Sequence, residues 1–507
     1  MLNKLCLGIL SISFAILVLP LIGTYAGQEK SQTNSRVIVG ALVVDGTGRK
    51  AFPANVRIVG DRIANVGDFA ARAGDEIIQA KGLIIAPGFI DIHNHSEEGL
   101  AREPTAQTQV SQGITTLAVG PDGGSPWPIS DYLDKREAQK TAVNVLAFVG
   151  HATVRQQAMG KDYDRAATPD EIARMAKLVE QGMNEGAAGL SSGLEYDVGR
   201  RATTEELIEL ARAAAKRGGI YMTHMRDEEE GMLEALQEAI NIGTQAHLPV
   251  QISHIKMGNR NVWNQASRAI ELVTKARVRG ADVTADCYPY TAWASTISIL
   301  VPSRKHDDKQ EVEKSLSNVG GAGNVLITNC RSHPDFEGKT LDDLARAAGS
   351  TAVDVYQMII RDGGAGIVCN SMNEADVLAF YRQPWVMVGS DGGVGTRHPR
   401  GAGTFTRVLG RFVREKAWLT LEEAVRKMTS APASRLGIND RGLIREGMKA
   451  DIVIFDAKRV IDRSTFKEPQ LLSAGIERVI VNGEPVWEHD RVTGRLPGRI
   501  IRKNSVR

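Results

Sequence analysis

Eight short apolar segments recur along the middle of the chain, and most precede a stretch with the pattern of an amphipathic helix. Strands that alternate with helices indicate a parallel sheet with helices on its faces. The candidate strands are Leu83–Ile92, Thr115–Gly120, Val143–Gly150, Ala188–Leu194, Ile220–Thr223, Val250–Ser253, Asp282–Ala285 and Val386–Ser390. Eight such units are the number in a TIM (β/α)8 barrel, so we predict an α/β fold of that type.

The spacing of the strands also predicts the domain organisation. Residues 296–384 are too long for one connecting helix, so we expect an inserted subdomain between strands 7 and 8. Both ends of the mature chain, 27–82 and 441–507, alternate apolar and polar residues in short runs broken by glycine. We expect them to form one small β-sandwich domain built from both termini, beside a barrel over 83–440.

The N-terminus predicts export. Lys4 precedes an apolar run, Leu5–Leu21, and Thr24-Tyr25-Ala26 resembles a small-residue cleavage site. Residues 1–26 therefore indicate a signal peptide, and an uncleaved membrane anchor is the alternative. In either case we expect the folded part outside the cytoplasm, periplasmic or secreted.

Charge and cysteine usage exclude several classes of protein. The chain has 62 Lys and Arg against 60 Asp and Glu, for a net charge of +2, with no basic block. A nucleic-acid partner is therefore not expected, nor a membrane contact beyond the N-terminal signal. Outside the signal only three cysteines remain, Cys287, Cys330 and Cys369, so at least one thiol is free and no dense disulfide framework exists. The sequence does not indicate an oligomeric state.

Polar side chains stand where the predicted strands end. In order they are His93 and His95, Asp122, His151, Glu195, His224, His254, Asp286 and Asp391. Residues two apart on a strand point to the same face, so His93 and His95 can reach one metal ion. Four neutral imidazoles on neighbouring strand ends suit zinc. Asp391 at the last strand can serve as a general base, or more simply cap the next helix.

Taken together, the segments HNH (93–95), HM (224–225), HIK (254–256) and SDGG (390–393) resemble the amidohydrolase superfamily. Further stretches, GHATVR, GLSSGLEY, DCYPY and the HPR segment at 398–400 followed by GAGTFTRVLGRFVRE, are similar to the N-acyl-D-amino-acid deacylases, or D-aminoacylases. The resemblance covers nearly the whole mature chain. It implies a zinc-dependent amide hydrolase that acts on a small-molecule substrate.

The resemblance also implies roles for individual residues. His224 and His254 would hold one tightly bound zinc, and His93 and His95 a second, often weaker, metal. Asp391 would be a ligand as well as the general base and acid. Substrate-binding roles fall to Arg400 for the α-carboxylate, with Arg397 as a competing anchor, and to Tyr288, Tyr290 and Lys256 along the substrate site.

One position departs from the family pattern. The deacylases have a cysteine ligand after the second strand, and Asp122 stands there in this chain. We expect Asp122 to be a metal ligand, although it can also cap a turn. With the thiolate missing, either Asp122 or Glu195 can bridge two metals. His151 is expected near the substrate, and Asp286 is either part of the site or structural.

The substrate is less well defined than the chemistry. N-acyl-D-amino acids fit the family, and D-containing dipeptides or cyclic amides are alternatives on the same scaffold. The HPR segment favours a free α-carboxylate over a cyclic amide. Outside enzymes, a non-catalytic barrel that binds a ligand remains the alternative, although such a protein is expected to have lost metal ligands.

Overall fold

The computed structural model describes residues 35–503, so the predicted signal peptide, residues 1–26, lies outside the described residues. Its parallel strands lie in two sheets, with the orders β10-β9-β8 and β11-β12-β13-β14-β15-β19. The strands are β8 (Phe89–Asp91), β9 (Ile114–Val119), β10 (Asn144–Ala147), β11 (Val149–Gly150), β12 (Gly189–Gly193), β13 (Ile220–His224), β14 (Val250–Ile252), β15 (Val283–Cys287) and β19 (Val386–Val388). Each of the eight predicted segments overlaps at least one of these strands, and β9, β13 and β15 extend one or two residues beyond the prediction.

Two segments differ in detail from the prediction. The third is interrupted at Phe148, so that β10 pairs with β9 and β11 with β12. The first contains two strands, because the chain turns at Gly88 from β7 (Ile84–Pro87) into β8. A Cβ at Gly88 would lie 2.3 Å from the Thr115 side chain, so only glycine allows this close approach.

The first and last parallel strands meet beyond their carboxyl ends. The Asp391 N–H donates to the His93 carbonyl over 2.9 Å, and the His95 N–H donates to the Gly392 carbonyl over 2.6 Å. The residues that follow β8 and β19 are therefore held side by side, and the two sheets follow one another in chain order. This connection brings residues about 300 positions apart in the sequence to the same edge.

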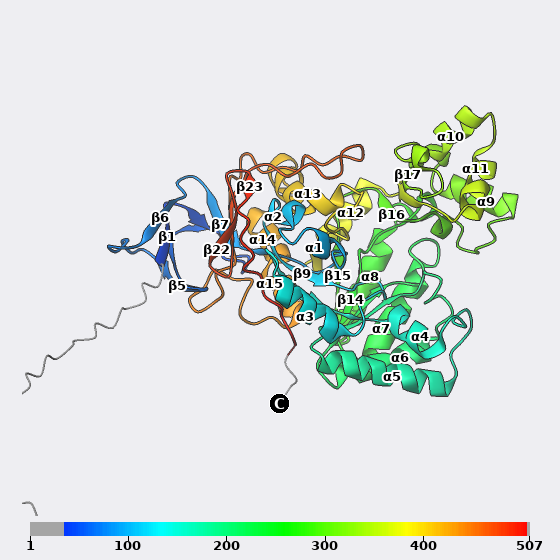
Figure 1. The fold of residues 1–507 in the computed structure, drawn as a ribbon, viewed down its shortest axis with the longest axis horizontal. Helices are drawn as coiled ribbons and strands as arrows, with labels where there is room; N and C mark the ends of the chain where they lie inside the picture. The colour runs from blue at the N-terminus through cyan, green and yellow to red at the C-terminus, as the bar shows by residue number, and fades with distance from the viewer. Residues whose placement is uncertain (1–34, 504–507) are drawn as a thin grey trace, which may run out of the picture.

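Helices connect the parallel strands and cover them (Figure 1). They are α1 (Gly99–Arg102), α2 (Gln107–Val110), α3 (Ile129–Gln139), α4 (His151–Met159), α5 (Pro169–Asn184), α6 (Thr204–Ala215), α7 (Met232–Ala246), α8 (Ala266–Val278), α12 (Glu374–Tyr381), α13 (Arg400–Arg407), the π-helix η5 (Val408–Glu415), α14 (Leu421–Met428), α15 (Ser430–Leu436) and the 3-10 turn η1 (Arg260–Val262). Thr168, Thr203 and Thr420 cap α5, α6 and α14, as their sequences indicate.

The two ends of the chain share one sheet. It has the order β23-β22-β21-β20-β7-β2-β3, so β7 from the N-terminal half pairs with β20 from the C-terminal half. A second sheet, β5-β4-β1-β6, packs beside it, at the left in Figure 1. The strands are β1 (Ser35–Val39), β2 (Leu42–Val43), β3 (Phe52–Pro53), β4 (Asn55–Val59), β5 (Arg62–Gly67), β6 (Glu76–Gln79), β20 (Ile452–Phe455), β21 (Ile476–Val481), β22 (Glu484–Glu488) and β23 (Arg491–Val492).

A separate antiparallel sheet, β16-β18-β17, lies between β15 and β19. Its elements are β16 (Trp293–Thr296), η2 (Ile297–Leu300), α9 (Lys309–Asn318), η3 (Ala322–Asn324), β17 (Val325–Asn329), η4 (Pro334–Phe336), α10 (Leu341–Ala348), α11 (Ala352–Arg361) and β18 (Gly366–Cys369). They project at the upper right of Figure 1. Helix α12, which lies within the predicted insertion 296–384, instead packs against α8, β15 and β19. Between Ser35 and Lys503, no helix is long and apolar enough to span a bilayer.

Candidate metal centre and active site

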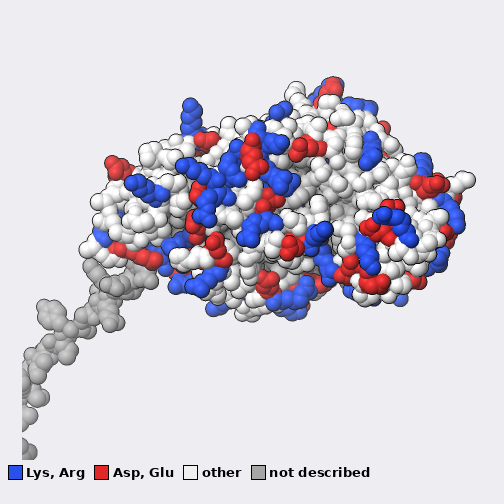
Figure 2. All heavy atoms as spheres, turned by 90° about the horizontal axis from the view of Figure 1, so that it is seen from above, with Lys and Arg blue, Asp and Glu red and all other residues white. Residues whose placement is uncertain are grey.

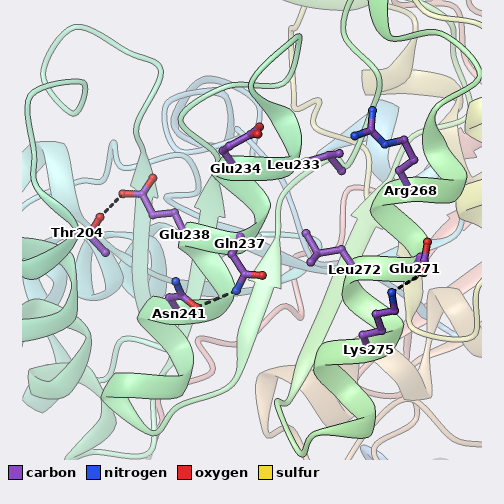
Figure 3. A pocket seen from close by; sticks show the side chains of 10 residues that line it. All are labelled: Thr204, Leu233, Glu234, Gln237, Glu238, Asn241, Arg268, Glu271, Leu272 and Lys275. Atoms are coloured by element: carbon purple, nitrogen blue, oxygen red, sulfur yellow. Dashed lines mark hydrogen bonds and ion pairs between the residues drawn. The ribbon is translucent and has the colours of Figure 1, made fainter.

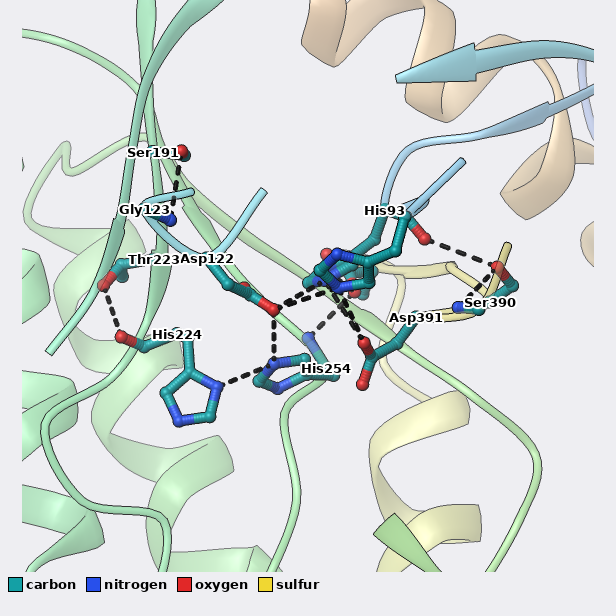
Figure 4. Close-up of polar contacts among 12 residues, drawn as sticks. His93, Asp122, Gly123, Ser191, Thr223, His224, His254, Ser390 and Asp391 are labelled. Carbon is teal, nitrogen blue, oxygen red and sulfur yellow. Dashed lines mark hydrogen bonds and ion pairs between the residues drawn. The ribbon is translucent and has the colours of Figure 1, made fainter. Parts of the chain in front are cut away.

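Six side chains converge beyond the carboxyl ends of the parallel strands. Figure 4 labels five of them, His93, Asp122, His224, His254 and Asp391. The six side chains form two groups of metal-ligand atoms, each within 4.8 Å of one another. One group is His93, His95, Asp122 and Asp391, and the other is Asp122, His224 and His254. These residues follow or end β8, β9, β13, β14 and β19. The sequence predicted this convergence, because parallel strands present their carboxyl ends at one edge.

Asp122 lies at the centre of this cluster and belongs to both groups. Its Oδ2 is 3.2 Å from His93 Nε2, 3.3 Å from His95 Nε2 and 3.5 Å from His254 Nε2. Its other oxygen, Oδ1, is buried and has no hydrogen-bond partner among the described residues. A carboxylate can hold one ion with each oxygen or two ions with one, so this placement suits a shared ligand.

Asp391 faces the same imidazoles from the last strand. Its Oδ1 is 3.2 Å from His95 Nε2, and its Oδ2 is 2.8 Å from the Arg400 guanidinium. Burial raises the pKa of Asp391, but Arg400 and the neighbouring imidazoles outweigh burial and hold that pKa well below its usual range. The carboxyl is therefore ionised and able to accept a proton.

The carboxylates also change the proton affinity of the histidines. Burial lowers the pKa of His95, but hydrogen bonds with Asp122 and Asp391 outweigh it and raise the pKa to about 10. Burial likewise lowers the pKa of His254, whereas nearby carboxylates, Glu228 foremost, raise it to about 9. A cluster that raises the proton affinity of imidazole stabilises positive charge, and a divalent cation provides that charge in place of protons.

Three of these residues adopt left-handed backbone conformations. The φ angles are 55° at Asp122, 31° at His254 and 49° at Asp391. Such angles are uncommon outside glycine and cost free energy, and they persist at sites where function requires them. Each turns the chain sharply at a strand end, which directs the side chain over the end of the sheets.

Two of the four imidazoles, those of His93 and His254, also face a carboxylate with their second ring nitrogen. Asp286 lies 3.3 Å from His93 Nδ1, and Glu228 Oε1 lies 3.0 Å from His254 Nδ1. Such partners fix the tautomer and the ring orientation of a ligating histidine. Asp286, whose role the sequence left open, therefore orients His93 from outside the ligand groups.

Glu195 takes the corresponding place beside His224. Its Oε2 lies 2.7 Å from His224 Nε2, whereas His224 Nδ1 lies 3.0 Å from His254 Nε2. Glu195, His224 and Glu228 form a third group of possible ligand atoms. Glu195 is absent from both groups that contain Asp122, so the geometry favours Asp122 over Glu195 as the shared carboxylate.

Sequence reasoning missed two residues of the site. Glu228 contacts His254 and pairs with Lys256, and the Tyr196 hydroxyl lies 3.2 Å from His224 Nδ1. A signal for each existed. Glu228 stands four residues after His224 in an acidic run, and Tyr196 follows Glu195 directly in the GLSSGLEY segment. An acidic run normally indicates a solvated surface, which is why Glu228 was not singled out.

A cavity opens beside the cluster, against His224, His254 and Asp391. Trp293 and Ile299, from β16 and η2, form its apolar side. The segment between β15 and β19 therefore contributes directly to the wall of the site. A cavity next to convergent polar groups is where a small-molecule substrate is expected.

The predicted substrate-binding residues fall in different places. Lys256 lines the cavity, with its Nζ 2.7 Å from His254 Nδ1. Arg400 lies behind Asp391 with its guanidinium 4.8 Å from the Tyr288 ring centre, and its Nε is buried without an acceptor. Tyr290 donates to the Pro399 carbonyl, and its ring packs on Arg407, so it supports the HPR segment from behind.

Two other candidates lie apart from the cluster. His151 begins α4, and its Nε2 is 2.9 Å from Glu206, which also pairs with Arg155; all three side chains are fully buried. The structure does not bring His151 into either ligand group with Asp122 or into the cavity wall. Arg397 donates to the Thr328 carbonyl and pairs with Glu337, so it is engaged with the segment between β15 and β19.

Another hollow of the described residues is less suited to catalysis. A hollow between α7 and α8 is lined by polar side chains that pair with one another, such as Gln237 with Asn241 and Glu271 with Lys275 (Figure 3). Positive and negative side chains are interspersed over the face seen in Figure 2. The three cysteines of the described residues are buried, and none forms a disulfide. The odd number of cysteines already required at least one of them to be free.

Comparison with known proteins agrees with this geometry. The model of the amidohydrolase family matches residues 76–487. A D-aminoacylase of Alcaligenes xylosoxydans xylosoxydans is 37% identical over 503 residues, covering 94% of this chain and 99% of that protein. The chain belongs to the amidohydrolase family, in the group of the N-acyl-D-amino-acid deacylases. The resemblance stated from its motifs is thereby confirmed, and the chain is a hydrolytic enzyme.

Two solved structures of this group are similar over nearly the whole chain. One, of a D-aminoacylase with a binuclear metal centre that one metal activates and a second attenuates, is 34% identical with a TM-score of 0.83. The other, an N-acyl-D-glutamate deacylase of Bordetella bronchiseptica with zinc and a phosphonate mimic of the tetrahedral intermediate, is 34% identical with a TM-score of 0.84. In each comparison the match covers 92% of this chain and 99% of the other.

Proposed function

We propose that this enzyme is a zinc-dependent deacylase that hydrolyses the amide bond of N-acyl-D-amino acids. The observation that carries the proposal is the pair of ligand groups that share Asp122, next to a cavity that also contains Asp391. Both groups retain every candidate metal ligand that the sequence predicted for them, whereas a non-catalytic barrel protein is expected to have lost metal ligands. The likeness to deacylases of D-amino acids supports the choice of substrate class.

The donor set fits zinc, which accepts imidazole and carboxylate ligands. His224, His254 and Asp122 would hold the tightly bound ion, and His93, His95 and Asp391 would complete a second position with Asp122 shared. The unpaired, buried Oδ1 of Asp122 supports this assignment because a buried carboxylate oxygen needs a partner. Zinc in such a site lowers the pKa of water toward neutrality and polarises a carbonyl.

The protein side chains supply proton transfer and orientation. Asp391, kept ionised by Arg400, accepts the proton of the attacking water and then donates it to the leaving amine. The Arg400 guanidinium also has a buried Nε without a hydrogen-bond acceptor, which suits the α-carboxylate of the substrate. Lys256 and Tyr196 line the same cavity as Asp391 and would orient the amide.

We also infer the architecture and the location. The two parallel sheets, joined beyond β8 and β19, would be the parts of one (β/α)8 barrel, over residues 83–440, that carries the antiparallel sheet as an insertion. The sheets from both ends would form the small domain over 27–82 and 441–507. Lys4 and the apolar run after it support export to the periplasm or medium with cleavage near Ala26, which the mass of the mature N-terminus tests.

Paired substrates test the activity. The mature, zinc-loaded protein should release amine from N-acetyl-D-amino acids and not from their L-enantiomers. Asp391→Asn, prepared and loaded in the same way, is the matched control and should release amine about 10²- to 10⁴-fold more slowly. Release from D-containing dipeptides or ring opening of cyclic amides, with no action on the N-acetyl series, would contradict the proposal.

A further inference from the structure

One carboxylate of the substrate cavity has no positive partner. Glu195 and Glu228 line the cavity too, but Glu195 lies against His224, and Glu228 is paired with Lys256. Glu229 lines the same cavity, and no Lys, Arg or His of residues 35–503 lies within ion-pair distance of its carboxylate. The cavity therefore has a carboxylate that the protein itself leaves unneutralised.

The surroundings of Glu229 make this arrangement unfavourable in the absence of a ligand. Glu229 is only partly exposed, and its chain neighbours Glu228 and Glu230 are acidic as well. A partly buried carboxylate beside like charges is stabilised by a nearby cation. A ligand with a positive group would relieve this cost, whereas a second carboxylate would add to it.

Two other residues of the cavity lining, Trp293 and Gly258, accompany Glu229. Trp293 lines the cavity, and its indole N–H donates to the Gly258 carbonyl over 3.1 Å and to Ser371 Oγ over 2.8 Å, so its ring is fixed. A Cβ at Gly258 would lie 3.4 Å from Glu229 Cγ and 2.8 Å from the Glu228 carbonyl oxygen, so glycine leaves space here. An aromatic ring beside a carboxylate is a common setting for an ammonium or guanidinium group.

We propose that Glu229 and Trp293 receive the positively charged side chain of a basic D-amino acid, so that the preferred substrates are N-acyl derivatives of D-lysine, D-arginine or D-ornithine. The inference rests on the proposed deacylase function and narrows its substrate class. The remaining cation of the cavity, Lys256, does not oppose it, because Glu228 already neutralises its charge. The aliphatic stem of such a side chain would pack on Ala294 and Ile299.

The test compares substrates of equal shape and different charge. The ratio of kcat/KM for N-acetyl-D-lysine over N-acetyl-D-norleucine is measured for wild type, Glu229→Gln and Glu230→Gln. Wild type should favour lysine, and Glu229→Gln should reduce the ratio by about 10- to 100-fold, the range for a hydrogen bond between charged groups. Glu230, which is exposed and accepts from Asn259 and Asn261, is the matched control and should keep the wild-type ratio.

Each other outcome counts against the inference in a distinct way. A wild-type preference for norleucine or for N-acetyl-D-glutamate, with good deacylase activity, would overturn the basic side-chain assignment and leave the proposed function intact. If Glu229→Gln keeps the wild-type ratio, Glu229 is not the residue that causes the preference for a basic side chain. Failure to hydrolyse every N-acetyl-D-amino acid would overturn both the function and the inference.

Discussion

Replacement of Glu206 by glutamine should destabilise the protein by removing one charge from a fully buried cluster. Glu206 pairs with Arg155 and lies 2.9 Å from His151, and the exposed fraction of all three side chains is 0%. Arg155 also donates to the Tyr163 carbonyl over 3.2 Å, so it cannot turn toward solvent without losing that bond. The variant therefore leaves a buried guanidinium without its counter-ion.

The expected size of this effect follows from the burial. Removing one partner of a buried ion pair costs about 3–5 kcal/mol, because the remaining charge stays uncompensated. At roughly 1 kcal/mol/K of unfolding entropy for a chain of this length, the Tm should fall by about 3–5 °C. The double variant Arg155→Met, Glu206→Leu removes both charges and should recover most of the loss.

The effect should also depend on pH. Burial raises the pKa of Glu206, but His151 and Arg155 outweigh burial and lower it below the ordinary value. A lowered pKa in the folded state adds stability above the unfolded pKa of about 4.3, and this stability is lost as the pH falls through the folded value. The difference in Tm between wild type and Glu206→Gln should therefore be full near neutrality and shrink in acid.

Differential scanning calorimetry of the zinc-loaded proteins, from neutral pH into the acid range, measures this difference. A shift below about 1 °C at neutral pH, or one that grows as the pH falls, would refute the reasoning. The kcat/KM of Glu206→Gln provides a separate check on His151. Because His151 lies outside the cavity wall, kcat/KM at a temperature well below the Tm should stay near the wild-type value.

Four further variants test the site. Asp391→Asn should lower kcat by about 10²- to 10⁴-fold while at least one zinc per chain remains by mass spectrometry, and a near-normal kcat would remove Asp391 as the base. Asp122→Cys, loaded with Co²⁺, should gain a near-ultraviolet thiolate band that wild type lacks, and such a band in wild type would mean that a cysteine already binds the metal. Arg400→Met should raise KM. It should also move the acid limb of the pH profile of kcat/KM to higher pH, because the pKa of Asp391 rises without the guanidinium. An acid limb at the wild-type pH would contradict the effect of Arg400 on Asp391. Glu228→Gln should weaken zinc binding by about 10- to 100-fold in a chelator competition, and unchanged affinity would show that His254 needs no support.

The pattern of apolar segments predicted the strands because buried parallel strands are continuous hydrophobic runs. It also predicted the ligand groups, since a residue directly after such a strand lies at the same edge as its neighbours. His151 also follows a strand, but it begins α4 and its side chain contacts Glu206 instead of the cluster. This orientation depends on how α4 and α6 pack, which the sequence pattern does not reveal. Glu228 and Glu229 lie in a loop after β13, where no periodicity exists to distinguish a buried carboxylate from a solvated one.

The pairing of β7 with β20 also determines at what stage of synthesis the protein can finish folding. Ile84–Pro87 leaves the ribosome early, but its partner Ile452–Phe455 follows more than 360 residues later. The edge of β10 is likewise closed by the last residues, through the bonds of Val145 with Arg499 and Ile501. Because pairing over such sequence distances is slow, the edge of β7 that faces β20 stays unpaired until the C-terminal part of the chain is available, although β2 already pairs with the other edge. Truncation at the C-terminus should therefore also destabilise the N-terminal strands. A fragment that lacks either end of the chain should not fold into an active enzyme.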